Sequence, residues 1–351
     1  MSNSRRKFLR SAGLSTAGLF FLPGIANFGF SPADNTDENN TPDKIKPARL
    51  KVGDTVAITA PAGALWDEGK TVNSFTQVLQ KLGFKVVLGK SLEKRHGYFA
   101  GTDEERANEL NAFFANQEVR AVFCAKGGWG SSRLLELLNF NRIRENPKIL
   151  MGFSDITTLL NAIYSKTGLV TFHGPVGNSS WNSFTIEHFI SVVMQAQKTN
   201  FVFPEGKQKE ATTLNGGSCT GELVGGNLTV LAAMVGTGFL PMFKNKILFL
   251  EEAHEEPYSI DRMLTQLKLS GVFDEVKGIV FGKCTECEAE EPEKSFTVQE
   301  VLQQHFANAG IPVLSGAAFG HVENKWTLPI GVNAELNATA GTLSLLESAV
   351  Q

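Results

Sequence analysis

After its first fifty residues, the chain alternates short apolar segments with segments of helical spacing. The apolar segments predict buried strands at residues 55–60, 84–88, 121–125, 149–153 and 169–172. The intervening segments predict helices at 71–82, from Thr102 to Phe114, from Ser132 and after Ser154. Thr102 and Glu105 form the spacing of a capping box. This alternation predicts a parallel sheet that is covered by helices.

The second half of the chain has a less regular pattern. Helices are expected at 227–235, at 259–269 and after a second capping box at Thr297 and Glu300, with strands at 246–250, 278–281, 326–328 and 342–346. Residues 197–220 are polar and rich in turn formers, which is typical of a connection between domains. We therefore predict an α/β protein with an N-terminal parallel-sheet domain (48–196), a linker (197–220) and a C-terminal mixed α/β domain (221–351).

The first 33 residues have the pattern of an export signal. Arg5 and Arg6 precede a small, apolar stretch over 11–30, which is typical of a twin-arginine signal peptide. The cleavage pattern at 31–33 predicts a mature chain that starts near Asp34, with a disordered lead-in over 34–47. Glycines and Pro23 interrupt the apolar stretch, so it is a poor permanent membrane span. The expected location is the periplasm, and a cytoplasmic basic patch is the alternative.

Composition narrows the possible partners. The chain has 351 residues, 42% of them hydrophobic, which suits a globular protein with a substantial core. Removal of residues 1–33 takes away four basic residues and no acidic ones, and changes the net charge from −3 to −7. Binding to nucleic acid or anionic lipid through bulk charge is therefore not expected.

The cysteines are Cys124, Cys219, Cys284 and Cys287. A disulfide between Cys284 and Cys287, or a metal bound by both, is one interpretation in an exported protein. Ordinary packing or surface cysteines are the favoured interpretation. A single Cys-x-x-Cys is weak support for zinc, so no metal and no cofactor is expected.

Ser154 is a candidate nucleophile. It lies in Gly152-Phe153-Ser154-Asp155, where an apolar strand turns into a helix. A serine at such a turn projects its hydroxyl from the sheet edge, beside the amides of the helix. The same residues also suit an ordinary helix N-cap.

A glycine-rich loop, Lys126-Gly127-Gly128-Trp129-Gly130, follows the third expected strand. Its backbone amides can approach a phosphate or an oxyanion closely, although a simple tight turn explains the glycines equally well. The loop lacks the complete Walker and dinucleotide-binding patterns.

Carboxylates and histidines supply the other candidates. Glu251 ends a buried strand and is expected at the rim of the sheet, whereas Glu252 is expected to face solvent. A divalent-metal site near these residues has no recognised ligand spacing. His321 and His173 are rival candidates for a base, and the local sequence does not choose between them.

Taken together, these segments resemble the family of LD-carboxypeptidases and microcin C self-immunity peptidases. The resemblance extends over about residues 53–347. Its matching blocks are Thr59–Gly63, Lys126–Gly130 with Arg133, Met151–Thr157, Phe172–Pro175, Gly225–Leu228, Leu250–Glu252 with Arg262 and Phe319–His321. Lys126 stands where the family more often has arginine, and Trp129 where tyrosine is frequent.

The resemblance implies a Ser154–Glu251–His321 triad between two α/β domains, usually in a homodimer. In such a triad, backbone amides near Gly128 and Asp155 are expected to form the oxyanion hole. Candidate substrate-binding residues are Lys126, Gly127, Trp129 and Arg133. Lys126 or Arg133 is the candidate to hold a carboxylate, and a helix-surface charge or a structural ion pair explains each of them equally well.

The expected activity is release of terminal D-alanine from peptidoglycan tetrapeptides by cleavage of the L–D amide. The alternatives are a hydrolase of peptidyl or aminoacyl nucleotides, and a non-catalytic protein that binds muropeptides. Trp181, in the loop 178–182, would stack on a base in the nucleotide alternative, although packing beneath the loop is the favoured interpretation.

Overall fold

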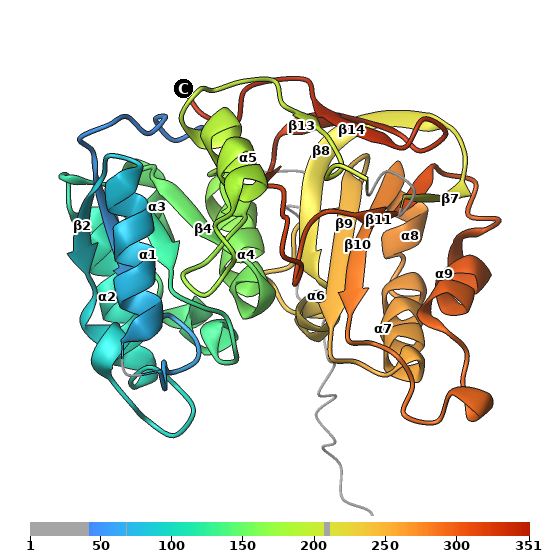
Figure 1. Ribbon diagram of the computed structural model, residues 1–351, viewed down its shortest axis with the longest axis horizontal. Coiled ribbons are helices and arrows are strands. Elements are labelled where there is room, and N and C mark those ends of the chain that lie inside the picture. The colour runs from blue at the N-terminus through green and yellow to red at the C-terminus, as the bar shows by residue number, and fades with distance from the viewer. Residues whose placement is uncertain (1–41, 68, 207–210) are drawn as a thin grey trace, which may run out of the picture. The chain divides into compact units, whose positions relative to one another are not determined.

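A computed structural model describes residues 42–67, 69–206 and 211–351 of the chain. The expected signal and most of the expected lead-in therefore lie outside the described residues. The described chain contains two β-sheets, each accompanied by helices (Figure 1). Among the described residues, no helix is both long and apolar enough to span a bilayer.

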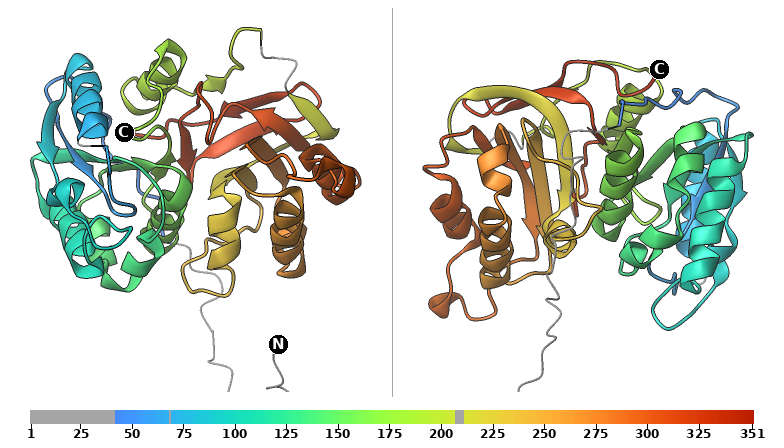
Figure 2. Two further views of the ribbon diagram at one scale, coloured as in Figure 1. Left: turned by 60° about the horizontal axis from the view of Figure 1, so that its bottom comes forward. Right: turned by 180° about the vertical axis from the view of Figure 1, so that it is seen from behind.

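The N-terminal part is built on a six-stranded sheet in the order β12-β5-β4-β3-β1-β2. Five strands are parallel, and they are β1 (Thr55–Thr59), β2 (Lys85–Leu88), β3 (Val119–Cys124), β4 (Ile149–Gly152) and β5 (Thr171–His173). The accompanying helices are α1 (Lys70–Lys81), α2 (Asp103–Ala115), α3 (Phe140–Glu145), α4 (Thr157–Thr167) and α5 (Ser183–Val193). Figures 1 and 2 show α1 and α5 on one face of the sheet and α2, α3 and α4 on the other. The expected parallel sheet and the capping box at Thr102 are confirmed.

The C-terminal part is built on an eight-stranded mixed sheet in the order β6-β14-β13-β8-β9-β10-β11-β7. Its parallel centre consists of β8 (Ser218–Asn227), β9 (Ile247–Ala253), β10 (Gly278–Thr285) and β11 (Val313–Ala317). The antiparallel outer strands are β6 (Asn200–Phe201), β7 (Thr212–Asn215), β13 (Asn333–Asn337) and β14 (Thr342–Leu345). The helices are α6 (Leu228–Met234), α7 (Pro257–Leu269), α8 (Val272–Glu275) and α9 (Val298–Phe306). The expected mixed sheet is confirmed.

The structure differs from the expected division of the chain in two places. The segment 197–220 contains the strands β6 and β7, which form the two edges of the second sheet. In addition, β12 (Leu328–Ile330) returns from the C-terminal part to pair antiparallel with β5. Both differences involve strands of two to four residues, which are too short to produce a clear alternating pattern.

Helix α4 lies between the two sheets. Nine of its eleven residues are buried, as expected of a helix that is covered on most sides. Asn161 Nδ2 donates to the carbonyl of Gly225 at 2.9 Å, and the amide of Asn227 donates to Thr157 Oγ1 at 3.0 Å. A Cβ on Gly226 would lie 2.5 Å from Thr157 Oγ1, and Gly226 has a φ of 143°. A glycine is therefore required where α4 crosses β8.

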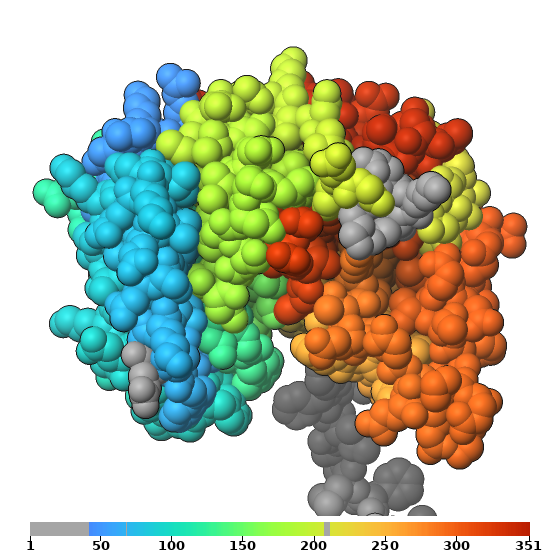
Figure 3. Space-filling view, viewed as in Figure 1, coloured from blue at the N-terminus to red at the C-terminus, as the bar shows by residue number. Residues whose placement is uncertain are grey.

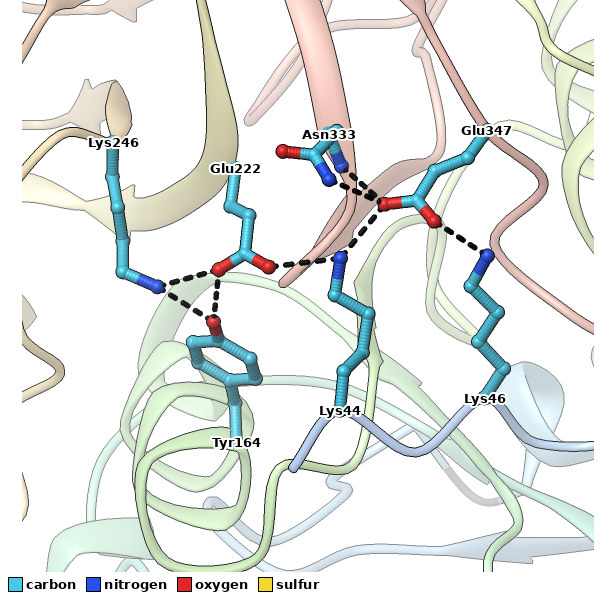
Figure 4. Close-up of polar contacts among 7 residues, drawn as sticks. All are labelled: Lys44, Lys46, Tyr164, Glu222, Lys246, Asn333 and Glu347. Carbon is cyan, nitrogen blue, oxygen red and sulfur yellow. Dashed lines mark hydrogen bonds and ion pairs between the residues drawn. The ribbon is translucent and has the colours of Figure 1, made fainter. Parts of the chain in front are cut away.

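A chain of polar contacts, which we call the inter-sheet cluster, joins α4 and β8 to both ends of the described chain (Figure 4). Its members are Lys44, Lys46, Tyr164, Glu222, Lys246, Asn333 and Glu347. Lys44 Nζ lies 2.8 Å from Glu222 Oε1 and 2.7 Å from Glu347 Oε1. Burial would raise the pKa of Glu347, but the bonds from Lys44 and Lys46 lower that pKa to about 2.

We predict that Glu347→Gln destabilises the protein at neutral pH and not in acid. The lowered pKa of Glu347 stabilises the fold above the usual value of 4.5, and this contribution disappears as the pH falls from 4.5 towards 2. Because the side chain is partly exposed, we expect a loss of about 1–2 kcal/mol at pH 7. Urea unfolding at pH 7, 5 and 3 measures the difference. Glu335→Gln, at an exposed position on β13, is the control. An equal effect of Glu347→Gln at all three pH values would contradict the prediction.

Candidate active site

Ser154 lies directly beyond β4, at the carboxyl edge of the first sheet. Its φ is 63°, an uncommon and strained conformation for a residue other than glycine. The loop after β3 approaches closely, because a Cβ on Gly127 would lie 2.8 Å from Ser154 Cβ and 3.0 Å from its Oγ. The amide of Gly63, after β1, donates to the carbonyl of Gly127 at 3.2 Å. The ends of three neighbouring strands thus surround the serine.

The second sheet contributes Glu251 and His321 from its own carboxyl edge. Glu251 lies on β9, and His321 follows β11. Glu251 Oε2 accepts a hydrogen bond from His321 Nδ1 at 2.8 Å, and the glutamate is completely buried. Burial would raise the pKa of Glu251, but the hydrogen bond and charge of His321 hold it below its usual value. Gly320 has a φ of 91°, and a Cβ there would collide with the Glu251 carboxylate.

Ser154 and His321 both line a pocket of about 740 Å³. Its walls include Trp129 and Arg133 from the N-terminal part and Asn227 from the C-terminal part. Figure 3 shows the surface indented between these two parts of the molecule. The structure therefore brings the serine and the histidine of the expected triad to one pocket, with the glutamate bonded behind the histidine.

The rival histidine, His173, is in a different environment. It is only 1% exposed, and neither ring nitrogen has a hydrogen-bond partner in the described part of the chain. Its ring packs against those of Phe153, Phe249 and Phe319. Burial lowers the pKa of His173 to about 4, so the ring is neutral at pH 7. Among the described residues, His321 is therefore the better placed of the two to exchange protons in the pocket.

The amides expected to form the oxyanion hole belong to residues that line the same pocket as Ser154. Asp155 is in the first turn of a helix, where amides lack intrahelical acceptors. Its carboxylate accepts from the amide of Ser131 at 2.8 Å, and its carbonyl accepts from Ser131 Oγ at 2.6 Å, which fixes the turn. Gly128 lines the pocket with a φ of 113°. The role of both amides stays a prediction.

Only two of the four expected substrate-binding residues line the pocket in the described chain. Trp129 and Arg133 line the pocket, and about half of the surface of each is exposed. Lys126 and Gly127 are not among the described residues that line it; Lys126 Nζ lies 3.5 Å from the carbonyl of Ala64, and Gly127 packs against Ser154. Of the two candidate carboxylate binders, only Arg133 therefore reaches the pocket.

The expectation that Glu252 faces solvent is wrong. Glu252 is 2% exposed and accepts hydrogen bonds from Asn227 Nδ2 at 2.9 Å and from the amide and hydroxyl of Thr229 at 2.8 Å each. Asn227 also caps α6, because its Oδ1 accepts from the amide of Val230. The sequence pointed to Asn227 only as part of the block Gly225–Leu228, and its bond to Glu252 depends on the pairing of β8 with β9. No group of three potential metal ligands occurs among the residues that the structure describes.

Trp181 and the pair Cys284 and Cys287 make contacts within the fold. Trp181 Nε1 donates to the carbonyl of Val176 at 3.0 Å, and its ring packs against Phe75 and Phe189, as the packing interpretation expects. Cys284 and Cys287 are free thiols, and Cys287 Sγ donates to the carbonyl of Thr285 at 3.4 Å.

We predict that His173→Leu makes the stability of the protein less sensitive to acid. The unfolded chain binds a proton at the usual pKa of 6.5, whereas the folded pKa of His173 is about 4, so stability falls as the pH drops between these values. The leucine variant lacks this loss of roughly 2–3 kcal/mol. Urea unfolding at pH 7, 5.5 and 4 tests it, with the exposed His96→Leu as control. An identical pH dependence in wild type and His173→Leu would show that burial does not keep this ring neutral.

The chain matches known proteins over most of its length. Residues 56–174 match the LD-carboxypeptidase N-terminal domain, and residues 220–336 match the LD-carboxypeptidase C-terminal domain. A probable murein peptide carboxypeptidase of Bacillus subtilis is 40% identical over 307 residues, which cover 87% of this chain and 95% of the relative. The microcin C7 self-immunity protein MccF of Escherichia coli is 32% identical over 333 residues, covering 86% and 95% of the two chains.

Solved structures agree with these matches. MccF in complex with aspartyl sulfamoyl adenosine superposes with a TM-score of 0.81 at 30% identity, covering 88% of this chain and all of that chain. The muramoyltetrapeptide carboxypeptidase of Oxalobacter formigenes superposes with a TM-score of 0.73 at 33% identity, covering 83% of this chain and 97% of that one. With matches to both domains and a fold shared with these structures, this chain belongs to the LD-carboxypeptidase family.

Proposed function

We propose that this protein is a serine carboxypeptidase that releases terminal D-alanine from peptidoglycan tetrapeptides by hydrolysis of the L–D amide. The observation that carries the proposal is the Glu251–His321 hydrogen bond of 2.8 Å beside a pocket that also contains Ser154. The murein peptide and muramoyltetrapeptide carboxypeptidases to which the chain is similar support the substrate class.

In the proposed mechanism, Glu251 holds the Nδ1 side of the His321 ring. The other ring nitrogen, Nε2, then takes the proton from Ser154 as its Oγ attacks the carbonyl carbon of the L–D amide. His321 returns that proton to the leaving amine of D-alanine, and a water molecule hydrolyses the acyl-enzyme by the same route. The amides of Gly128 and Asp155 would stabilise the oxyanion, a contribution of about 3–4 kcal/mol for each donor.

Arg133 is the proposed receptor for the substrate's terminal carboxylate. Its Nε and Nη2 contact the carboxylate of Asp103, with Nε–Oδ2 at 2.8 Å and Nη2–Oδ2 at 2.7 Å. This pairing orients the guanidinium and leaves Nη1 without a hydrogen-bond partner in the described chain. A free guanidinium N–H at the wall of the pocket suits a carboxylate.

The proposed setting is the periplasm, reached through the twin-arginine signal expected at residues 1–33. There the enzyme would meet peptidoglycan fragments as a homodimer, the state that the family resemblance implies.

Hydrolysis of aminoacyl or peptidyl nucleotides is the alternative function. It is supported by the similarity to MccF in complex with aspartyl sulfamoyl adenosine. The packing of Trp181 against Phe75 and Phe189 removes one expected stacking platform for a base. A non-catalytic muropeptide-binding protein is a weaker alternative, because all three triad positions are occupied.

We predict that purified mature protein removes one D-alanine from a muropeptide tetrapeptide without added metal. Ser154→Ala, His321→Ala and Glu251→Gln are expected to lower kcat/KM by at least about 10³-fold, because nucleophile, base and orienting carboxylate act as one unit. Mass spectrometry of the products measures the loss of alanine. A tetrapeptide with terminal L-alanine is the substrate control.

The outcomes of this experiment are distinct. Equal cleavage by wild type and Ser154→Ala would exclude Ser154 as the nucleophile. If wild type cuts neither tetrapeptide but hydrolyses an aminoacyl sulfamoyl nucleotide, the alternative function is correct.

We also predict that Arg133→Met raises KM for the tetrapeptide about 10-fold and changes kcat less than about 3-fold, because it removes a contact made equally in the ground and transition states. Lys126→Met is the matched control and is expected to leave KM unchanged, since Lys126 does not line the pocket. The steady-state kinetics of both variants provide the measurement. An increase of KM in Lys126→Met alone would reverse the assignment.

A further inference from the structure

Lys325 is a buried charged side chain next to the candidate active site. It is only 4% exposed. Its Nζ donates to the carbonyl of Gly320 at 3.2 Å and lies 4.6 Å from the centre of the Phe153 ring. Gly320 directly precedes His321, and Phe153 directly precedes Ser154. One ammonium group therefore contacts the chain neighbours of both residues that exchange a proton in the proposed mechanism.

The Lys325 ammonium is also near the Glu251 carboxylate and the ring that packs on His321. The Phe153 ring meets the His321 ring edge to face, with centroids 4.8 Å apart. Glu251 is completely buried, and its Oε1 has no hydrogen-bond partner in the described chain. Burial lowers the pKa of Lys325 to about 8, against the attraction of the Glu251 carboxylate. At neutral pH the ammonium is therefore largely charged and balances part of the buried negative charge.

We propose that Lys325 is a positioning residue of the active site, whose ammonium joins the Ser154 turn to the His321 loop. The proposal rests on the proposed serine peptidase function. Ser154 transfers its proton to His321 only when the two side chains are aligned, and a displacement of about 1 Å is costly. Contact with both Phe153 and Gly320 restricts how far the two sheet edges can move apart.

The contacts of Lys325 come from both parts of the molecule. Glu251 on β9 attracts its ammonium, the Gly320 carbonyl accepts its hydrogen bond, and the Phe153 ring faces it. The amide of Lys325 donates to Thr185 Oγ1 at 3.2 Å. Removal of the ammonium therefore loosens the Phe153 and Gly320 segments together, while the backbone contact to Thr185 remains.

Lys148 provides a matched control. It is 5% exposed, and its Nζ donates to the carbonyls of Asn116 and Val119 at 2.7 Å each. Burial lowers its pKa to about 8 as well. Lys148 precedes β4, at the opposite end of the strand from Ser154. The two lysines therefore share burial and the capping of carbonyls, and only Lys325 is near the site.

The test compares wild type, Lys325→Met and Lys148→Met. In Lys325→Met we expect kcat for the tetrapeptide to fall about 10- to 100-fold, with KM changed less than about 3-fold, because the variant misaligns Ser154 and His321 and removes no contact with the substrate. Lys148→Met should lose stability and keep the wild-type kcat.

NMR of the histidine Cε1–H resonances at one pH separates this inference from the proposed function. In Lys325→Met the His321 resonance should shift or broaden, whether or not the tetrapeptide is a substrate, whereas in Lys148→Met it should keep its wild-type position. Lys325→Gln, whose side chain is shorter and lacks the ammonium, serves if the methionine variant does not fold.

The possible results divide clearly. An unchanged His321 resonance in Lys325→Met or Lys325→Gln would overturn the positioning role. Kinetics in Lys325→Met that match those of Lys148→Met would overturn it as well. Failure of wild type to cut the tetrapeptide, with a displaced His321 resonance in Lys325→Met, would refute the proposed substrate and leave the inference about Lys325 standing.

Discussion

The close approach of α4 to β8 is the contact on which the candidate active site depends. Ser154 lies at the start of the turn that leads into α4, and Asn227 ends β8. The hydrogen bonds from Asn161 to Gly225 and from Asn227 to Thr157 fix the helix against the strand. Helix α4 connects two strands of the first sheet, and β8 is a strand of the second sheet. This crossing therefore sets the distance between the carboxyl edges of the two sheets. Only a glycine at 226 permits it, since any Cβ there would overlap Thr157.

The arrangement of two facing sheet edges explains why the site contains residues that are far apart in the chain. Ligand and catalytic sites of open α/β sheets lie beyond the carboxyl ends of the strands. Here β4 presents Ser154, while β9 and the loop after β11 present Glu251 and His321. Each sheet by itself contains only part of the constellation. The inter-sheet cluster in Figure 4 provides further contacts between the sheets on the side of Tyr164 and Glu222.

Burial and hydrogen bonding give similar side chains within this site different environments. Glu251 is held ionised by His321, whereas burial raises the pKa of its neighbour Glu252 despite the hydrogen bonds from Asn227 and Thr229. His173 lies among aromatic rings without a polar partner and is neutral, while His321 is partly exposed and bonded to a carboxylate. The environment of each group, and not its residue type, therefore decides its chemical role.

The sequence by itself determined the parallel strands of the first sheet, the strands β9 and β10 of the second sheet, the mixed α/β architecture and the family of the chain. These properties depend on local periodicity, on capping residues such as Thr102 and Thr297, and on motifs that are continuous in the chain. Local patterns did not distinguish His173 from His321, and they placed Glu252 in solvent. They also predicted no strand at β6, β7, β8 or β13, and they placed the strand near β12 in the C-terminal domain instead of beside β5. Only the tertiary structure decided these points, because burial, hydrogen-bond partners and the pairing of short edge strands depend on segments that are distant in the sequence.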